Sequence, residues 1–255
     1  MSSLSSTRGG WLRQRRKDYR WRVRGEAGAG PTWVRGEARV HRGWVLLDET
    51  TVEPYAPLRE PDLLREFVAI GSSRDVLRFA ARFGLLRDGP GSDLREPISQ
   101  WWEEIGLARG ALEVQLDLTA ARRGNARDIA RLRDSWQASL PGSPAPVSDA
   151  ELFAEARATV VAAVNRGLAG AQLEISMEPE PLRGYSLSPK LPDLLAFIYF
   201  ALANVLVEES PLARCLECGG TFVVHDRRQR YCSERHASRA RYRRFTDRNR
   251  RTTAS

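Results

Sequence analysis

The chain contains three cysteines, and all of them lie with a histidine in one short segment near the end of the sequence. Cys215 and Cys218 form a C-x2-C pair, and after thirteen residues Cys232 and His236 form a C-x3-H pair. Pairs at these spacings can fold into tight turns and close a tetrahedral shell of soft thiolates and one imidazole, the coordination that Zn²⁺ prefers. The sequence therefore predicts one structural zinc ion held by these four residues.

Two alternatives compete with this ligand set. A disulfide with one free thiol needs an oxidising compartment, and an odd number of cysteines fits it poorly. The start MSSLSSTRGGWLRQRRKDYR is polar and basic and has no pattern of a secretory signal, so we expect a cytoplasmic protein. His225, in TFVVHD, is the other candidate for the fourth ligand, and His236 is favoured because it completes a pair with Cys232.

The longest apolar stretch of the chain is LLAFIYFALANVLV, residues 194–207, and Asn204 interrupts it. A membrane span needs roughly 18 consecutive apolar residues. We therefore expect a buried helix here and no membrane partner.

The positive charge of the chain is concentrated at its two ends. Residues 8–24 carry a net charge of +7 and residues 227–251 a net charge of +9, which leaves −8 for the rest of a chain whose total is +8. An acidic body with basic ends indicates that the ends meet an anion, and nucleic acid is the commonest candidate.

The composition along the chain predicts four regions. Residues 1–36 combine a serine-rich start, a basic run and GEAGAGP, and are expected to form a disordered arm. A mostly helical domain follows over residues 37–209, with a proline-rich linker at 139–149 that either separates subdomains or crosses between helices. The zinc module with its basic helix occupies residues 210–247, and a disordered tail occupies residues 248–255.

Apolar periodicity predicts a fold that is mainly α with small β elements, an α+β protein ending in a small treble-clef or ribbon-like zinc finger. One or two short strands are expected within ARVHRGWVLLDETTVEPY, and helices in DLLREFVAI and in DVLRFAARFGLL after Ser72 and Ser73. A helix of about seven turns is expected from EPISQWW onward. Of its adjacent tryptophans, Trp101 and Trp102, we expect one to be buried in the core and the other to be partly exposed. Further helices are expected in NARDIARLRDSW and after Ser148, then strands in AQLEISME and GYSLS.

Within the zinc module, Cys215-Leu-Glu-Cys218-Gly-Gly predicts a zinc knuckle whose glycines let backbone amides turn toward the sulfurs. Residues 221–224 are expected to form a short strand, with Tyr231 and Cys232 as the opposing strand. Ser233 is expected to cap a helix that carries His236 in its first turn.

Arginines of this last helix lie at helical spacing. Arg235, Arg239 and Arg243 form one stripe, and Arg241, Arg244 and Arg248 a neighbouring one, while Ala237 and Ala240 with Tyr242 or Phe245 are expected to pack back on the strands. Outward guanidinium groups can bind phosphates or guanine edges. The alternative is a solvated helix or one that docks on the acidic body. The predicted nucleic-acid contacts are Arg228, Arg230, Arg235, Arg239, Arg241, Arg243 and Arg244.

At these residues the chain resembles the bacterial zinc fingers of the CGNR type, in which a C-x2-C knuckle, a Phe-containing strand and an arginine-rich turn precede C-G-N-R and a basic helix. The counterpart here is His236, Ala237, Ser238 and Arg239, so only the arginine is kept and a histidine replaces the metal-binding cysteine. Upstream, LLREFVAIGSSRDVLRFAARFGLL and EPISQWW are similar to the helical ABATE-like domain that accompanies such fingers. The resemblance covers residues 44–245 and implies a stress-linked transcription regulator.

These features favour a DNA-binding regulator whose helical body senses a signal or forms a homodimer. A zinc-stapled protein-interaction module and an RNA-binding protein are the alternatives. We expect no enzyme, because the chain has no H-E-x-x-H, G-x-S-x-G or phosphate-binding loop and three thiolates with one imidazole close the metal shell. His225 beside Asp226 is the one candidate for acid–base chemistry.

Overall fold

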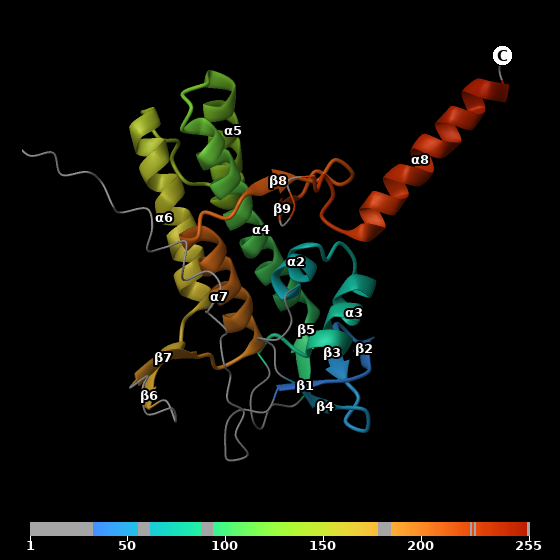
Figure 1. Ribbon diagram of the computed structural model, residues 1–255. Helices are drawn as coiled ribbons and strands as arrows, with labels where there is room; N and C mark the ends of the chain where they lie inside the picture. Colours follow the sequence, from blue (N-terminus) through green and yellow to red (C-terminus); the bar gives the residue numbers. More distant parts are fainter. Residues whose placement is uncertain are drawn as a thin grey trace, which may run out of the picture.

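The computed structural model describes residues 33–55, 62–87, 94–177, 185–224, 226 and 228–253. Within these ranges the chain is mainly helical with small antiparallel sheets (Figure 1), which confirms the α+β class. Residues 1–32, most of the expected N-terminal arm, lie outside the described ranges, and so does His225.

The N-terminal part consists of two small sheets and two helices. β1 pairs with β4, and β2, β3 and β5 form a three-stranded sheet in that order, all antiparallel. Ser72 caps α3 by accepting a hydrogen bond from the backbone N–H of Asp75, as its position in the sequence predicts. The elements are β1 (Trp33–Arg35), β2 (Ala38–His41), β3 (Trp44–Leu47), β4 (Glu53–Tyr55), α2 (Leu63–Val68), α3 (Ser73–Phe83) and β5 (Arg95–Pro97).

Three long helices pack together next to this part. α4 (Ile98–Ala121) contacts both α5 (Ala126–Ser139) and α6 (Asp149–Gly167), and residues 140–148 connect the latter two. Trp101 is fully buried and Trp102 is 37% exposed, which confirms the expected anchor and neighbour. A second core lies among the three helices and contains Val114, Leu118, Ala121, Leu132, Trp136, Leu152, Ala156 and Val160.

The apolar helix α7 (Leu194–Val207) lies in the main core, as its composition predicts. It follows the antiparallel pair β6 (Gln172–Met177) and β7 (Tyr185–Lys190), and Asp193 caps it. Among the described residues, no helix combines the length and the apolar character that a membrane crossing requires.

A buried carboxylate joins α4, α6 and α7. Glu104 is 2% exposed and accepts hydrogen bonds from Tyr199 Oη at 3.1 Å, from Arg166 Nη2 at 2.9 Å and from Arg87 Nη2 at 3.1 Å. A Cβ added at Gly167 would lie 2.0 Å from the Tyr199 ring, so only glycine lets α6 approach α7 here. The helical body is therefore fixed by polar as well as apolar contacts.

The C-terminal module consists of β8 (Leu212–Arg214), β9 (Thr221–Val223) and α8 (Glu234–Thr253). β8 pairs antiparallel with β9, so the expectation that Tyr231 and Cys232 oppose the second of these strands is wrong. The two strands lie against α4, and β9 also contacts α2, whereas α8 extends away from the body (Figure 1). α8 continues to Thr253, so the boundary that we placed at residue 247 falls inside a helix.

Candidate metal centre

The candidate ligands come from two turns that the hairpin and α8 bring together. Cys215 follows β8, and a turn closes over it with a hydrogen bond from Gly219 N to Cys215 O and another from Cys215 N to Gly220 O, both of 2.9 Å. Gly219 has a φ of +73°, a left-handed conformation that favours glycine. This turn places Cys218 on the same side as Cys215.

The second pair sits at the start of α8. Ser233 accepts a hydrogen bond from His236 N at 3.3 Å, and Ala237 N donates to Ser233 O at 3.0 Å, so Ser233 caps the helix as expected. Because Cys232 and His236 are one helical turn apart, both side chains face the first pair.

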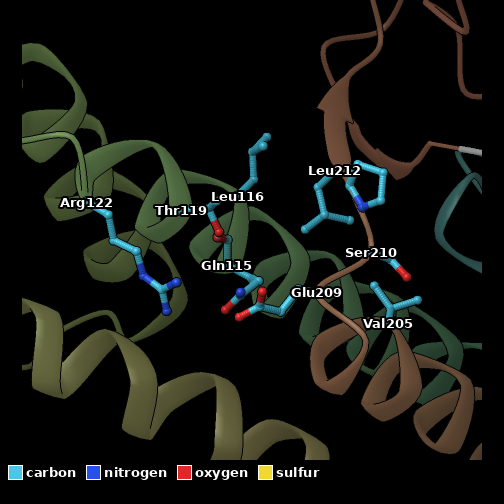
Figure 2. Close-up of a pocket in the computed structure, with 9 residues that line it drawn as sticks. Gln115, Leu116, Thr119, Arg122, Val205, Glu209, Ser210 and Leu212 are labelled. Carbon is cyan, nitrogen blue, oxygen red and sulfur yellow. The ribbon is translucent and has the colours of Figure 1, made fainter. Parts of the chain in front are cut away.

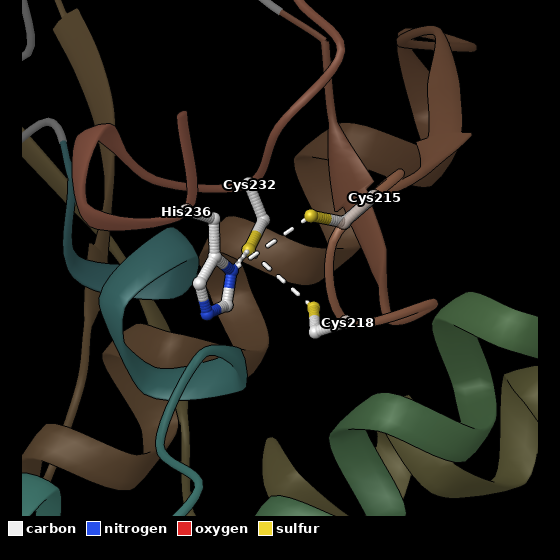
Figure 3. A group of neighbouring side chains, drawn as sticks. All are labelled: Cys215, Cys218, Cys232 and His236. Carbon is white, nitrogen blue, oxygen red and sulfur yellow. Dashed lines mark hydrogen bonds between the residues drawn. The ribbon is translucent and has the colours of Figure 1, made fainter. Parts of the chain in front are cut away.

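The four ligand atoms lie within 4.8 Å of one another and could hold one metal ion (Figure 3). Cys218 Sγ is 3.8 Å from Cys232 Sγ, and Cys215 Sγ is 3.7 Å from His236 Nδ1. A tetrahedral zinc shell with bonds of about 2.3 Å to sulfur and about 2.0 Å to nitrogen has S–S edges of about 3.8 Å and S–N edges of about 3.5 Å. Both distances fit these edges, while the third, 2.9 Å from Cys232 Sγ to His236 Nδ1, is a hydrogen-bond distance between thiol and imidazole.

The interior of the module is small. Cys215 and Cys232 are 2% and 6% exposed, and with the fully buried Phe222 they form a separate core. Cys218 is exposed. Three buried residues supply little hydrophobic stabilisation, so a bound metal ion would contribute much of the folding free energy of this module.

The surroundings of the thiols shift their pKa values in opposite directions. Burial raises the pKa of Cys215, but hydrogen bonds from the backbone of Cys232, Cys218 and Glu217 outweigh burial and lower it to about 6. Burial and the neighbouring thiolates at Cys218 and Cys215 raise the pKa of Cys232 to about 12. Three thiolates this close repel one another, so a cation would displace the last proton and take its place.

A guanidinium group from the helical body approaches the thiolates. Arg109 of α4 donates Nε to Val68 O at 2.7 Å and donates a second hydrogen bond to Ile70 O, so it satisfies carbonyls at the end of α2. Burial lowers the pKa of Arg109, while the negative charges of Cys218 and Cys232 raise it. Arg109 therefore offsets part of the negative charge that three thiolates bring to the site.

A second arginine ties the module to α4. Arg214, directly before Cys215, donates to Asp117 Oδ1 and Oδ2 at 3.0 and 2.7 Å and to Glu113 Oε1 at 2.9 Å. Asp117 is 3% exposed. The sequence analysis missed this contact and that of Arg109, although two acids one turn apart on an apolar helix face gave a signal for a buried cation partner.

All seven predicted nucleic-acid arginines are exposed, and the acidic body does not cover them. Some of them make ion pairs: Arg235 Nη1 lies 3.5 Å from Asp75 Oδ1 of α3, Arg241 pairs with Glu234, and Arg243 pairs with Glu217 of the knuckle. The predicted set is Arg228, Arg230, Arg235, Arg239, Arg241, Arg243 and Arg244.

The helical period separates α8 into two faces. At about 100° per residue, the side chains of His236, Ala240 and Arg243 share one face. His236 belongs to the candidate metal site, Ala240 is buried, and Arg243 pairs with Glu217. This face of α8 therefore looks toward the module. The exposed surface away from this contact is named here the outer face: Ser238, Arg241, Tyr242 and Phe245 lie opposite the module, and Arg235 and Arg239 lie at the edge of this surface.

Two aromatic side chains on the outer face differ from the expectation. Tyr242 is 68% and Phe245 is 61% exposed, so neither packs back on the strands, whereas Ala240 is buried as expected. The two rings stay exposed because Ala240 and Arg243, one and two turns after His236, already occupy the face of α8 that looks toward the module.

Comparison of the chain with protein-family models, with curated proteins and with solved structures found no match. The resemblance to CGNR fingers and to the ABATE-like domain therefore stays a prediction from the motifs.

Proposed function

We propose that the chain is a zinc-dependent DNA-binding protein that acts as a transcription regulator. Three thiolates and one imidazole are the soft donor set of a structural zinc site, and four protein ligands leave no open position for substrate. The zinc would be held by Cys215, Cys218, Cys232 and His236, and it would fix the first turn of α8 against the knuckle.

The exposed outer face of α8 is the observation that carries the DNA proposal. An α-helix with its side chains is about 10–12 Å across, and the major groove of B-DNA is about 12 Å wide. α8 extends from the body and is not covered by it, so a duplex can approach the outer face (Figure 1).

The side chains of the outer face suit the two kinds of contact that DNA offers. Arg235, Arg239 and Arg241 are exposed and can reach phosphates or the N7 and O6 atoms of guanine. Tyr242 and Phe245 are exposed between them, where an apolar side chain can contact the methyl group of thymine. A helix that displays only arginines would bind any polyanion, whereas the aromatic pair adds contacts that depend on the base.

Arg243 has a structural role that differs from the predicted nucleic-acid contact. It pairs with Glu217, whose side chain is 5% exposed, and so holds α8 to the knuckle. Of the seven predicted contacts, we therefore assign base and phosphate contacts first to Arg235, Arg239 and Arg241. Arg228 and Arg230, in the loop before Cys232, and Arg244 are assigned to flanking phosphates.

The test measures binding of a random-sequence DNA duplex by fluorescence anisotropy, with the full chain loaded with zinc, over a series of salt concentrations. The variant replaces Arg235, Arg239 and Arg241 by glutamine. The control replaces three exposed arginines of the helical body, Arg123, Arg127 and Arg157, which changes the net charge equally.

The slope of log K against log salt should fall by about 0.9 for each phosphate that the variant no longer neutralises, so by up to about 2.7 for three arginines. The control should keep the slope of the wild type. The proposal fails if the zinc-loaded chain binds no duplex at low salt, or if the variant and the control behave alike. Structured RNA that competes better than the duplex would favour the RNA alternative, and a decrease in stability on chelation without nucleic-acid affinity would favour the protein-interaction alternative.

A further inference from the structure

A pocket of about 190 Å³ lies between α4 and the segment that leads from α7 to the metal module (Figure 2). One wall is formed by Gln115, Leu116, Thr119 and Arg122 of α4 and its C-terminus. The other wall comes from the end of α7 and from the connection to β8, and contains Val205, Glu209, Ser210, Pro211 and Leu212. The pocket therefore combines aliphatic surface with one side chain of each charge.

Glu209 occupies an unusual backbone position. Ser210 N donates to Val205 O at 2.9 Å, and Glu209 N donates to Leu206 O at 3.3 Å, which together form a Schellman motif at the end of α7. The residue at the centre of this motif is normally glycine because it adopts a left-handed conformation, and Glu209 does so with a φ of +50°. Glutamate carries a steric cost here, and strained residues of this kind concentrate at ligand sites.

The charged groups of the pocket are available to a ligand. Within the described part of the chain, neither Glu209 nor Arg122 makes a side-chain hydrogen bond or an ion pair with another residue, and both are exposed at the rim. Figure 2 shows Arg122 toward one end of the pocket, Leu212 toward the other, and Glu209 and Gln115 between them. A guanidinium and a carboxylate at the rim of a partly aliphatic pocket match a small molecule with both an ammonium and a carboxylate group.

We propose that this pocket binds a small aliphatic α-amino acid, with its carboxylate on Arg122, its ammonium on Glu209 and its side chain against Leu116, Val205 and Leu212. The size agrees with this class. A cavity of about 150 Å³ holds benzene, with six heavy atoms, so 190 Å³ accommodates about eight, the number in valine.

The pocket lies next to the connection to the C-terminal module, so a ligand bound there can affect how this module is docked on the body. Ser210, Pro211 and Leu212 join α7 to β8, and Arg214 at the end of this strand is held by Asp117, which lies on α4 between the lining residues Leu116 and Thr119 in the sequence but does not itself line the pocket. A ligand that bridges α4 and this connection would favour the conformation in which the module is docked.

The experiment is isothermal titration of the zinc-loaded full chain with L-valine and L-leucine, together with isovalerate and isobutylamine, which are valine without its ammonium and without its carboxylate. We expect saturable binding of at least one of the two amino acids, and a decrease of about tenfold or more in affinity for each truncated analogue, since each lacks one charge-assisted contact. Isovalerate or isobutylamine that binds as tightly as valine would overturn the amino-acid assignment.

Two pairs of variants locate the site. E209Q and R122Q should each weaken binding about tenfold or more, while E208Q and R123Q, which change the neighbouring exposed charges, should leave it unchanged. Absence of heat and of any ligand-detected NMR signal for both amino acids at about 10 mM would refute the proposal, because even a Kd of 1 mM would then be detected. Equal binding by all four variants would refute it as well.

Discussion

The contact between Arg214 and Asp117 gives the sharpest prediction about how the module is held. Asp117 has a side chain that is 4% exposed and accepts both of its hydrogen bonds from one guanidinium, while Arg214 is 36% exposed. Removing one partner of a fully buried pair costs about 3–5 kcal/mol because the remaining charge stays buried without a partner. Since water reaches part of Arg214, we expect the R214M variant to lose about 2–3 kcal/mol of unfolding free energy.

The assay is urea unfolding of the zinc-saturated chain, with thermal unfolding as a second measurement. A change of 2–3 kcal/mol corresponds to a decrease in Tm of roughly 4–12 °C for a chain of this size. The D117L variant should be destabilised less, because Arg214 keeps Glu113 at 2.9 Å and also reaches solvent. The double variant should be more stable than R214M alone, with a coupling energy of about 1–3 kcal/mol.

A matched control replaces the exposed Arg157 of α6 by methionine, and it should change the stability by less than about 0.5 kcal/mol. The reasoning is refuted if R214M costs no more than this control, or if the effects of R214M and D117L simply add. Either result would mean that the module is held on the body by its apolar contacts alone.

Three further predictions concern other sites. Replacing both Tyr242 and Phe245 by alanine should leave the unfolding free energy within about 0.5 kcal/mol of wild type, because both rings are exposed. The same variant should bind a thymine-containing duplex more weakly in fluorescence anisotropy, and unchanged affinity would exclude these rings from the interface. E209G should raise the stability by about 1 kcal/mol in urea unfolding, because glycine adopts the left-handed conformation freely, and abolish valine binding; a destabilised variant would contradict the assigned strain. Burial raises the pKa of Asp193 above 3.8 although it caps α7, so its ionised form destabilises the folded state, and this cost appears as the pH rises from 3.8 through the raised pKa. The D193N variant keeps the cap, so it should be more stable than wild type at pH 7 and should lose this gain in stability as the pH falls to 3.8. The D193A variant loses the cap and should be about 1 kcal/mol less stable. A stability gain of D193N that grows toward acid pH would contradict the raised pKa of Asp193.

The parts of the site that depend on neighbouring residues could be predicted from the sequence. The C-x2-C turn, the cap at Ser233 and the place of His236 in the first helical turn each depend on fewer than six residues, and the structure contains all three. The burial of α7 could also be predicted from its own residues, since the apolar segment 194–207 could only be stable inside the core.

The parts that depend on distant residues could not be predicted. β9 pairs with the segment before Cys215 because this pairing buries Phe222 between the strands and the metal ligands, and nothing in the sequence of residues 221–224 distinguishes it from pairing with Tyr231. The contact from Arg214 to Asp117 spans 97 residues, and that from Arg109 to Val68 spans 41. Sequence periodicity carries no information on such pairs, whereas it does limit which face of α4 can supply them.

The contacts of the module separate what zinc fixes from what the body fixes. Leu212 and Val223 pack against the main core and Arg214 is held by α4, so the hairpin is positioned by contacts that need no metal. α8 is joined to the knuckle through His236, a candidate metal ligand, and through the ion pair of Arg243 with Glu217. Zinc removal should therefore release α8 before it releases the hairpin. The direction of α8 then depends on zinc and on the ion pair of Arg235 with Asp75 of α3, while the hairpin that carries α8 is held to the body by Arg214 and by the apolar contacts of Leu212 and Val223.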